Sequence, residues 1–282
     1  MKTFESKYIL KVAATPIGNL NEVTYRLIDA FNTADIVLCE DTRVTSNLLQ
    51  LIAIDNKPKL VKFEKFTEND MVNTVIEWIK SNKQVLLVSD AGYPLISDPG
   101  YTLVKACGKN EIAVEVINGP SSITHALVAS GFQTNNFMFL GFLGKTRQER
   151  TNYLSKYKDI ETTFVILESV HRIQDTLKDL KQILGNQNIV IARELTKKHE
   201  EIIRTNLDSI LNQEIHLKGE FVIVLENKPE IKQKDLSSLN DEILEMLNSN
   251  YKTKEISVVI GQKYNLDQKE IYNLVLKIKN EK

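Results

Sequence analysis

Short apolar runs alternate with segments of helical periodicity along the first half of the chain. Apolar runs that predict β-strands cover residues 8–14, 36–39, 60–63, 85–88 and 112–117. Between these runs, apolar side chains recur every three or four residues, as at Val23, Leu27 and Phe31, which predicts amphipathic helices. Strands and helices that alternate in this way form a mostly parallel sheet covered by helices. The pattern therefore predicts an α/β lobe over residues 1–118.

A second unit begins at Gly119-Pro120. Strands are predicted at 137–140, 163–167, 189–192, 201–204 and 221–225, and helices at 123–130, 173–184 and 207–211. Ser121 or Ser122 can cap the first of these helices, which should end at Gly131 because helices commonly end at a glycine. We therefore expect a second α/β lobe over residues 119–228.

A polar segment over residues 226–238 separates this lobe from the end of the chain. It is charged, contains Pro229 and has almost no apolar content, so it is the best candidate for a linker. Beyond it, helical patterns at 243–247, 256–264 and 271–278 predict a small helix-turn-helix-like extension over residues 239–282. Seven lysines stand against four acidic residues between 251 and 282, a local charge of +3. The extension is thus either a nucleic-acid contact or a solvated helical cap or dimer element.

The overall composition limits the class of protein. The hydrophobic fraction of 42% is typical of a folded globular chain. No apolar run is long enough to span a bilayer and no basic, apolar leader opens the chain, so we expect a cytoplasmic protein with no membrane contact. The two cysteines and four histidines show no metal-ligand spacing, which predicts no metal. A net charge of −1 means that any RNA contact must use local positive charge.

Three loops rich in glycine, proline and polar residues each follow a predicted strand directly. They cover residues 15–19, 89–100 and 118–122. Ligands of open α/β sheets bind beyond the carboxyl ends of the strands, where such loops gather. One such loop is usually only a turn, but three at successive strand ends favour a shared pocket. Neither a GxGxxG nor a GxxxxGK[ST] motif occurs, so a nucleoside cofactor without phosphates fits better than a dinucleotide or a nucleoside triphosphate.

Several side chains near these strand ends can take up a proton. The candidates are Glu40, Asp41, Asp98, Glu168, His171 and Glu194. Each also has a structural interpretation: Asp98 can cap the helix after Pro99, and residues 40–43 can form a local ion-pair network. The sequence does not single out one base.

The densest basic stretch of the chain lies in the second lobe. Its cations are Lys145, Arg147, Arg150, Lys156 and Lys158, opposed only by Glu149, for a charge of +4. On a helix Arg147 and Arg150 share a face. This stretch is interpreted either as a contact to an RNA backbone or as a solvated helix.

Six motifs occur in register between residues 8 and 225. They are Ala14-Thr15-Pro16-Ile17-Gly18-Asn19-Leu20, Glu40-Asp41-Thr42-Arg43, the 89–100 loop, Glu168-Ser169-Val170-His171-Arg172, Ala192-Arg193-Glu194-Leu195-Thr196-Lys197 and Lys218-Gly219-Glu220-Phe221. In this combination the chain resembles the ribosomal RNA small subunit methyltransferase I family, which is similar in fold to the tetrapyrrole methylases. The tail resembles the helical extension of that family.

The resemblance implies an activity, a cofactor and partners. The fold would be two α/β lobes with a cofactor cleft between them, plus the helical extension. S-adenosylmethionine would be the methyl donor, and the reaction would be 2′-O-methylation of a cytidine ribose in the decoding region of small-subunit rRNA. The partner would be this rRNA or the assembled small ribosomal subunit, and the enzyme would be a homodimer.

Loop placement and the resemblance together imply the residues of the site. Donor contacts are expected at Pro16, Ile17, Gly18, Asp90, Gly92, Tyr93, Ile96, Ser121, Ser122, Leu167 and Ala192. Catalytic roles are expected for Asp41, Arg43, Glu168 and Glu194. RNA contacts are expected at Arg147, Arg150, His171, Arg172, Arg193 and Lys197.

Two departures from the family pattern keep alternatives open. Tyr93 stands where the family usually has Thr, and residues 63–68 lack the His and Asn that relatives often carry there. These departures leave room for a ribosome-binding or assembly factor without catalysis. A tetrapyrrole methylase is the other alternative, against which the basic stretch and the helical tail argue.

Overall fold

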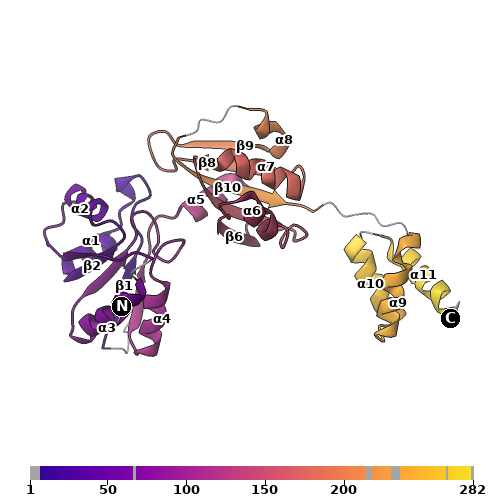
Figure 1. Ribbon diagram of the computed structural model, residues 1–282, viewed down its shortest axis with the longest axis horizontal. Helices are drawn as coiled ribbons and strands as arrows, with labels where there is room; N and C mark the ends of the chain where they lie inside the picture. The colour runs from indigo at the N-terminus through magenta and orange to yellow at the C-terminus, as the bar shows by residue number, and fades with distance from the viewer. Residues whose placement is uncertain (1–6, 66–67, 214–217, 230–235, 265, 281–282) are drawn as a thin grey trace. The chain divides into compact units, whose positions relative to one another are not determined.

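The computed structural model describes residues 7–65, 68–213, 218–229, 236–264 and 266–280. The chain divides into two compact units, Met1–Asn227 and Lys228–Lys282. The first unit contains two five-stranded sheets, and the second is helical in its described residues (Figure 1). None of the helices in these ranges has the length and apolar character that a bilayer span requires.

The first sheet is parallel throughout its described strands. These are β1 (Ile9–Ala13), β2 (Ile36–Cys39), β3 (Lys59–Lys62), β4 (Val85–Val88) and β5 (Ala113–Ile117), in the order β3-β2-β4-β1-β5. Every neighbouring pair runs parallel, which confirms the predicted sheet. Strands β2 and β4 are buried at all positions, as their uninterrupted apolar runs require.

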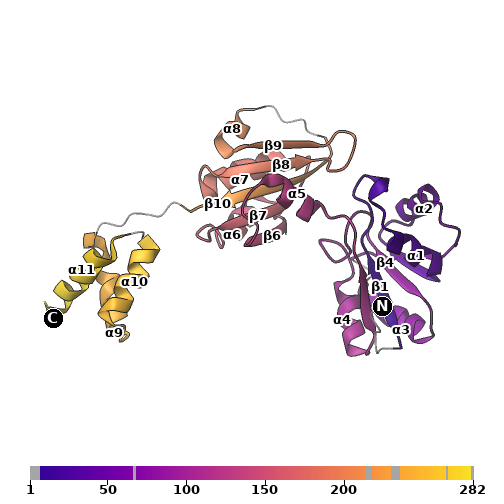
Figure 2. The same cartoon turned by 180° about the vertical axis from the view of Figure 1, so that it is seen from behind.

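Four helices cover this sheet. They are α1 (Tyr25–Thr33), α2 (Thr42–Leu51), α3 (Glu68–Lys80) and α4 (Tyr101–Lys109). Helices α3 and α4 pack with Leu10 and Leu87 on one face, while α1 and α2 pack with Val37 and Leu86 on the other. Figure 2 shows these two pairs of helices on opposite sides of β1 and β4. Helices therefore cover both faces of the sheet, and a ligand can reach it only beyond the carboxyl ends of its strands.

The second sheet is mixed. Its strands are β6 (Phe137–Phe142), β7 (Thr162–Ser169), β8 (Asn188–Arg193), β9 (Glu201–Asn206) and β10 (Glu220–Asn227), in the order β6-β7-β10-β8-β9. Only β6 and β7 pair in parallel, and the other described pairs are antiparallel. This lobe therefore differs in topology from the first, although both are α/β.

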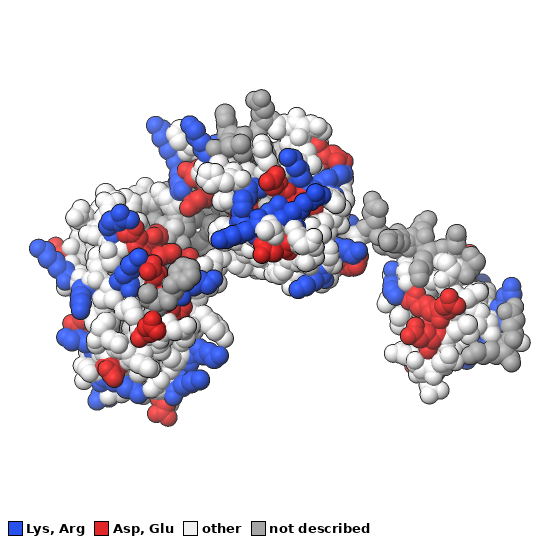
Figure 3. Space-filling view, viewed as in Figure 1, with Lys and Arg blue, Asp and Glu red and all other residues white. Residues whose placement is uncertain are grey.

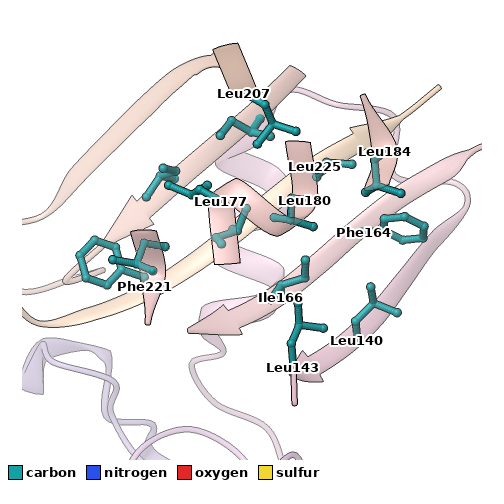
Figure 4. Close-up of a cluster of buried hydrophobic side chains, with 14 of the residues drawn as sticks. Leu140, Leu143, Phe164, Ile166, Leu177, Leu180, Leu184, Leu207, Phe221 and Leu225 are labelled. Atoms are coloured by element: carbon teal, nitrogen blue, oxygen red, sulfur yellow. The ribbon is translucent and has the colours of Figure 1, made fainter. Parts of the chain in front are cut away.

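Helices cover both faces of the second sheet as well. They are α5 (Ser122–Ser130), α6 (Arg147–Leu154), α7 (Ile173–Leu184) and α8 (Leu207–Leu211). Figure 4 shows Leu177, Leu180 and Leu184 of α7 packed with Phe164 and Leu225 of the sheet. Helix α5 packs on the opposite face. The periodic apolar positions predicted for these helices therefore form the core of the lobe.

The ends of α5 test the capping predictions. Gly131 ends the helix with a left-handed φ of 74°, as predicted. Ser121 occupies the N-cap position, but its hydroxyl accepts no capping hydrogen bond, so the predicted serine cap is wrong in that respect. Both Ser121 and Ser122 line a cavity instead.

The start of α4 also differs from one interpretation of the sequence. Gly100 is the N-cap, and the Asp98 side chain does not cap the helix. The buried Glu68 carboxylate caps it from α3, because its Oε1 accepts hydrogen bonds from the Thr102 and Leu103 amides at 2.6 and 3.3 Å. An acidic group at a helix N-terminus satisfies amides that have no partner within the helix. Asp98 therefore does not cap α4.

The second unit contains α9 (Asn240–Asn248), α10 (Thr253–Tyr264) and α11 (Gln268–Asn280), preceded by the 3₁₀ helix Leu236–Leu239. Its core is formed by apolar residues of the 3₁₀ helix and of all three α-helices, namely Leu239, Ile243, Ile256, Ile260, Ile271 and Val275. The predicted linker starts too early, because β10 continues through Asn227. The Asn227 amide donates to the Lys158 and Ile160 carbonyls at 3.1 and 2.7 Å. Residues 230–235 of that linker, and Phe66 and Thr67 of the 63–68 stretch, lie outside the described residues.

Candidate functional site

The three strand-end loops meet at one cavity of about 580 Å³. From the first lobe it is lined by residues 90–93 and 96–98, by Ile17 and by Glu40. The second lobe contributes the end of β7, the start of β10 and the first turn of α5. Eight of the expected donor contacts line it, namely Ile17, Asp90, Gly92, Tyr93, Ile96, Ser121, Ser122 and Leu167. Both its volume and its mixed lining are typical of small-molecule sites.

Hydrogen bonds tie the loops to one another. The backbones of Thr15 and Gly92 exchange two hydrogen bonds at 2.9 and 3.1 Å, which join the first loop to the second. The Tyr93 hydroxyl accepts a hydrogen bond from the Gly119 amide at 3.0 Å and lies 3.4 Å from Asn118 Oδ1. The tyrosine therefore ties the second loop to the third. Such mutual support holds the cavity wall in place before a ligand arrives.

Three carboxyl groups gather on the first-lobe wall of the cavity. Burial, followed by the charges of Glu40 and Asp90, raises the pKa of Asp98 to about 6. Burial also raises the pKa of Glu40 and of Asp90, and the Asp90 charge acts further on Glu40. We call Glu40, Asp90 and Asp98 the acidic triad. Because like charges in a partly dehydrated pocket repel one another, the triad favours a proton or a cationic ligand.

Asp41 and Arg43 lie beside the cavity without lining it. Asp41 caps α2, and its carboxylate accepts hydrogen bonds from the Arg43 amide and guanidinium at 2.6 to 3.0 Å. These bonds hold the pKa of Asp41 well below its usual range. The Arg43 side chain is 89% exposed and lines a shallow groove with polar residues of α2, namely Thr42, Ser46, Asn47 and Gln50. A local ion pair thus exists here, and its arginine faces solvent.

Glu168, for which a catalytic role is expected, lines the cavity and is held there by hydrogen bonds, and its catalytic role stays a prediction. Its side chain has no exposed surface. Oε1 accepts from the Ser169 amide and the Arg172 guanidinium, each at 2.8 Å, and Oε2 accepts from the Thr176 hydroxyl at 2.7 Å. Arg172 also donates to the Leu143 carbonyl at 3.1 Å, and the RNA contact expected of it stays a prediction. These bonds fasten the end of β7 to the start of α7.

The residues after β8 form an ion-pair network at the edge of the site. Arg193 pairs with Glu201 at 3.0 Å, and Lys197 pairs with Glu194 at 2.9 Å. The hydrogen bond from Lys197 lowers the pKa of Glu194. Ala192, by contrast, is fully buried in the core of the lobe between β9 and β10 and does not line the cavity, so the donor contact expected there stays a prediction.

Gly18 and Pro16 also lie outside the lining of the cavity. A Cβ added at Gly18 would collide with the Lys197 side chain and the Thr196 hydroxyl. Gly18 is therefore a point of close approach between the first loop and the turn after β8. His171, expected as an RNA contact, is exposed and lines the cavity.

The basic stretch is partly neutralised by α7. Figure 3 shows Lys and Arg side chains interspersed with acidic ones on the face of the second lobe that carries α6 and α7. Arg150 Nε lies 2.7 Å from Asp179 Oδ2, with both side chains only 6% exposed, and Arg147 Nε lies 3.4 Å from Asp179 Oδ1. Arg147 and Arg150 share a helix face as predicted, but this face meets α7. The charge of Arg150 is buried and paired, which does not favour the RNA contact expected of it.

Sequence reasoning missed an apolar wall of the cavity. It consists of Ile123, Phe142, Val170, Leu195, Phe221 and Val222. Their strands and helices were predicted, but a run of apolar residues does not reveal which end borders a ligand site. Only the register of the folded sheet places these side chains.

Comparisons with known proteins agree with this architecture. The family model described as Tetrapyrrole (Corrin/Porphyrin) Methylases matches residues 10–211. A protein of Mycoplasma genitalium named ribosomal RNA small subunit methyltransferase I is 41% identical over 271 residues, which cover 94% of this chain and 97% of that protein. The protein of the same name from Bacillus subtilis is 35% identical over 231 residues, which cover 80% and 78%.

Solved structures show the same fold at low identity. Diphthine synthase superposes with a TM-score of 0.60 at 13% identity, covering 79% of this chain and 91% of that one. The methyltransferase CobJ superposes with a TM-score of 0.60 at 16% identity, covering 79% and 95%. Both structures therefore share the fold of this chain over the part that they cover.

Proposed function

Because this chain belongs to the ribosomal RNA small subunit methyltransferase I family, within the tetrapyrrole methylases, we propose that it uses S-adenosylmethionine to methylate small-subunit ribosomal RNA. The proposed acceptor is the 2′-oxygen of a cytidine in the decoding region, as the family motifs imply. Its substrate is the rRNA or the assembled small subunit, and its compartment is therefore the cytoplasm.

The charge of the cavity lining is the observation that carries this proposal. Five of its described lining residues are acidic, and none of the described lining residues is Lys or Arg. Glu168 and Glu220 are paired with Arg172 and Lys197, and the charges of the acidic triad face the cavity without such a partner among the described ion pairs. Such a lining disfavours the phosphates of a dinucleotide and favours a ligand with positive charge. S-adenosylmethionine carries a sulfonium, an ammonium and an adenosine without phosphates, so the residues present fit it.

The walls supply the remaining contacts. Gly92 has a left-handed φ of 76°, which glycine adopts without strain, and it lies next to Ile17 in the wall. Ile17, Leu167 and Leu195 offer apolar surface for an adenine, and Ser121 and Ser122 offer hydroxyls and amides. The acidic triad offsets the positive charge of the ligand.

When bound, S-adenosylmethionine supplies an electrophilic methyl group on a positively charged sulfur. The residues of the chain would align the acceptor oxygen, exclude water and take up the proton that this oxygen loses as its bond to the methyl carbon forms, while the bond from that carbon to sulfur breaks and the sulfur leaves as a neutral thioether. We assign the proton to the Asp98 carboxylate, which then releases it to solvent. Asp98 lines the cavity, is ionised above about pH 6, and has no capping role to fill.

The test uses the full-length protein, tritiated S-adenosylmethionine and small subunits that lack the modification. Label is expected in rRNA, with a 2′-O-methylated nucleoside after digestion and mass spectrometry. Methyl on a base would contradict the ribose assignment. Activity on a porphyrinoid with none on subunits would replace the proposal by a tetrapyrrole methylase. Absence of S-adenosylmethionine binding in calorimetry would indicate a non-catalytic ribosome-binding factor.

Arg43 is proposed to contact the RNA at the edge of the site. Its exposed guanidinium suits a phosphate, and its α2 groove adjoins the cavity through the hydrogen bond between the Asp41 amide and Asp90 at 3.1 Å. We expect Arg43→Ala to raise the KM for small subunits roughly tenfold and to leave thermal unfolding unchanged.

Arg26→Ala is the matched control for this variant. Arg26 is an exposed arginine of the same lobe, paired with Glu115 at 2.6 Å on α1 and β5. Its replacement should leave both kinetic constants as they are. Equal effects of the two substitutions, or wild-type turnover after Arg43→Ala, would remove Arg43 from the RNA contact.

The helical unit is proposed to engage RNA and to leave the donor site unaffected. A truncation after Lys228 retains Asn227, whose side chain completes β10, and removes the unit as a whole. We expect the KM for small subunits to rise at least roughly tenfold through loss of its lysines, with the Kd for S-adenosylmethionine unchanged in calorimetry. Equal losses in both measurements would indicate a structural cap.

The domain boundaries and the oligomeric state are also proposals. Boundaries at 1–118, 119–228 and 239–282 are supported by the confinement of each sheet to one range. A homodimer is supported by Tyr25 and Val128, which are 88% and 82% exposed near a second hollow lined by Thr24 and Val128. Light scattering on the purified protein measures the state, and Val128→Glu should shift a dimer toward the monomer.

A further inference from the structure

Phe142 is a large aromatic residue whose side chain lies outside the hydrophobic core, at the cavity. It is the last residue of β6, it is 54% exposed, and it lines the cavity. It is absent from the buried apolar cores on both faces of the second sheet, the one that α7 packs on and the one that α5 packs on. An exposed aromatic ring beside a binding cavity offers a flat surface that a ligand can cover.

A β-bulge directs this ring toward the cavity. In the pairing of β6 with β7, Phe139 lies opposite Val165, Gly141 opposite Ile166 and Phe142 opposite Leu167, so one extra residue is inserted after Phe139. Without it, alternation would place Phe142 on the same face as Leu140, which is buried against α6 and α7. With it, Phe142 shares the face of Leu167, which lines the cavity. Bulges commonly redirect a side chain at active sites.

Gly141 makes the bulge possible. Its φ is +64°, a left-handed conformation that glycine adopts without strain. An added Cβ at this position would meet no atom closer than the Ser97 hydroxyl oxygen at 3.8 Å. Glycine is therefore needed here for the backbone conformation, since there is space for a side chain. The same distance shows that the 89–100 loop lies next to the bulge. Ile96, 45% exposed, and the exposed His171 line the same cavity.

The charge of the cavity decides what the ring can bind. An acidic lining without Lys or Arg among its described residues repels phosphates, so an acceptor nucleotide must be held there through neutral contacts. Bases of single-stranded RNA stack on aromatic side chains, and every base offers a π-face for this contact. The RNA backbone would remain outside, near cations such as Arg43.

We propose that Phe142 is the stacking platform for the base of the methyl-accepting nucleotide, which enters the cavity unpaired from its RNA helix. This inference rests on the proposed function and adds to it how the acceptor is held. The ring is a positioning residue: it fixes the nucleotide so that its ribose oxygen reaches the donor, and it takes no part in proton transfer.

The test compares full-length Phe142→Ala, Phe142→Leu, Phe142→Trp and Phe137→Ala. Phe137 is the matched control, since it lies on the same strand, is 45% exposed and does not line the cavity. Loss of one base stack should lower kcat/KM for small subunits by roughly 5- to 100-fold in the Ala variant. The Leu variant should remain impaired, because it restores bulk without a π-face. The Trp variant should retain activity, the Phe137 variant should match wild type, and the Kd for S-adenosylmethionine should stay constant in all.

A second readout does not depend on methyl transfer. The chain has one tryptophan, Trp78, so the indole introduced by Phe142→Trp adds a single new fluorophore, whose emission a stacked base should quench when single-stranded rRNA fragments are added. Wild-type kcat/KM after Phe142→Ala, or an equal weakening of donor binding, would overturn the proposal. If wild type deposits no methyl on rRNA, the proposed function fails, and the quenching still shows whether the ring stacks on a base.

Discussion

Replacing Asp98 by asparagine is expected to lower kcat/KM for small subunits by at least roughly 100-fold at neutral pH, since a positioned proton acceptor contributes about 10²- to 10⁴-fold. Asparagine keeps the shape of the side chain and removes its basicity. Because Asp98 lines the cavity beside Glu40 and Asp90, the variant also removes one of three mutually repelling charges. Its loss of activity should therefore accompany a gain in stability.

The pH dependence separates these two effects. Burial raises the pKa of Asp98 from 3.8 to about 6, so the carboxyl is protonated below pH 6 and ionised above it. The kcat/KM of the wild type should rise with pH up to about 6 and then level off. The kcat/KM of Asp98→Asn should not show this increase. A raised pKa means that the protonated form stabilises the fold and that this contribution is lost as pH rises through 6. The advantage of the variant in free energy of unfolding should therefore grow as pH rises from 3.8 to about 6 and be complete above pH 6.

Pre-steady-state rates and urea unfolding between pH 5 and 8 provide these measurements. Asp175→Asn is the control, because Asp175 is an exposed residue of α7, with a side chain 66% exposed, away from the cavity. It should change neither quantity. An Asp98→Asn enzyme that keeps its rate and its rise near pH 6 would show that another group accepts the proton.

Replacing Asp179 by alanine is expected to lower the free energy of unfolding by about 3–5 kcal/mol, the usual cost of leaving one charge of a buried ion pair without its partner. Arg150 and Asp179 are each only 6% exposed, and their atoms approach to 2.7 Å. The guanidinium would keep its bonds to the Lys145 and Gly144 carbonyls, at 3.0 and 3.4 Å, but its charge would stay buried without compensation.

Urea denaturation of the truncated first unit or of the full chain measures this loss. Asp175→Ala serves as control, since its ion pair with Lys178 is exposed and 3.9 Å long, and surface pairs contribute about 0–1 kcal/mol. The double variant Arg150→Met with Asp179→Leu should recover most of the loss, because apolar side chains can replace a buried pair. A change below about 1 kcal/mol for Asp179→Ala would show that water reaches this pair.

The sequence alone determined the layout of the chain. Continuous apolar runs such as β2 and β4 belong in the centre of a parallel sheet, because both of their faces are buried. The spacing of apolar residues in α7 predicted its bounds, Ile173–Leu184, as observed. Loops after strands of a parallel sheet must lie at the same edge, and the three glycine-rich loops do meet at one cavity. These features depend on local periodicity and direction, which a sequence displays.

Only the tertiary structure decided which polar groups are free. Arg150 looks like part of an open basic patch until Asp179, 29 residues further along the chain, pairs with it in the core, whereas Arg147 keeps 68% of its side chain exposed. The oxygens of Glu168 are occupied by Thr176 and Arg172, whereas burial, followed by the charges of Glu40 and Asp90, raises the pKa of Asp98. The exposed face of Phe142 depends on one inserted residue in the register of β6. Charge, burial and register are set by partners distant in sequence, and periodicity carries no information about those partners.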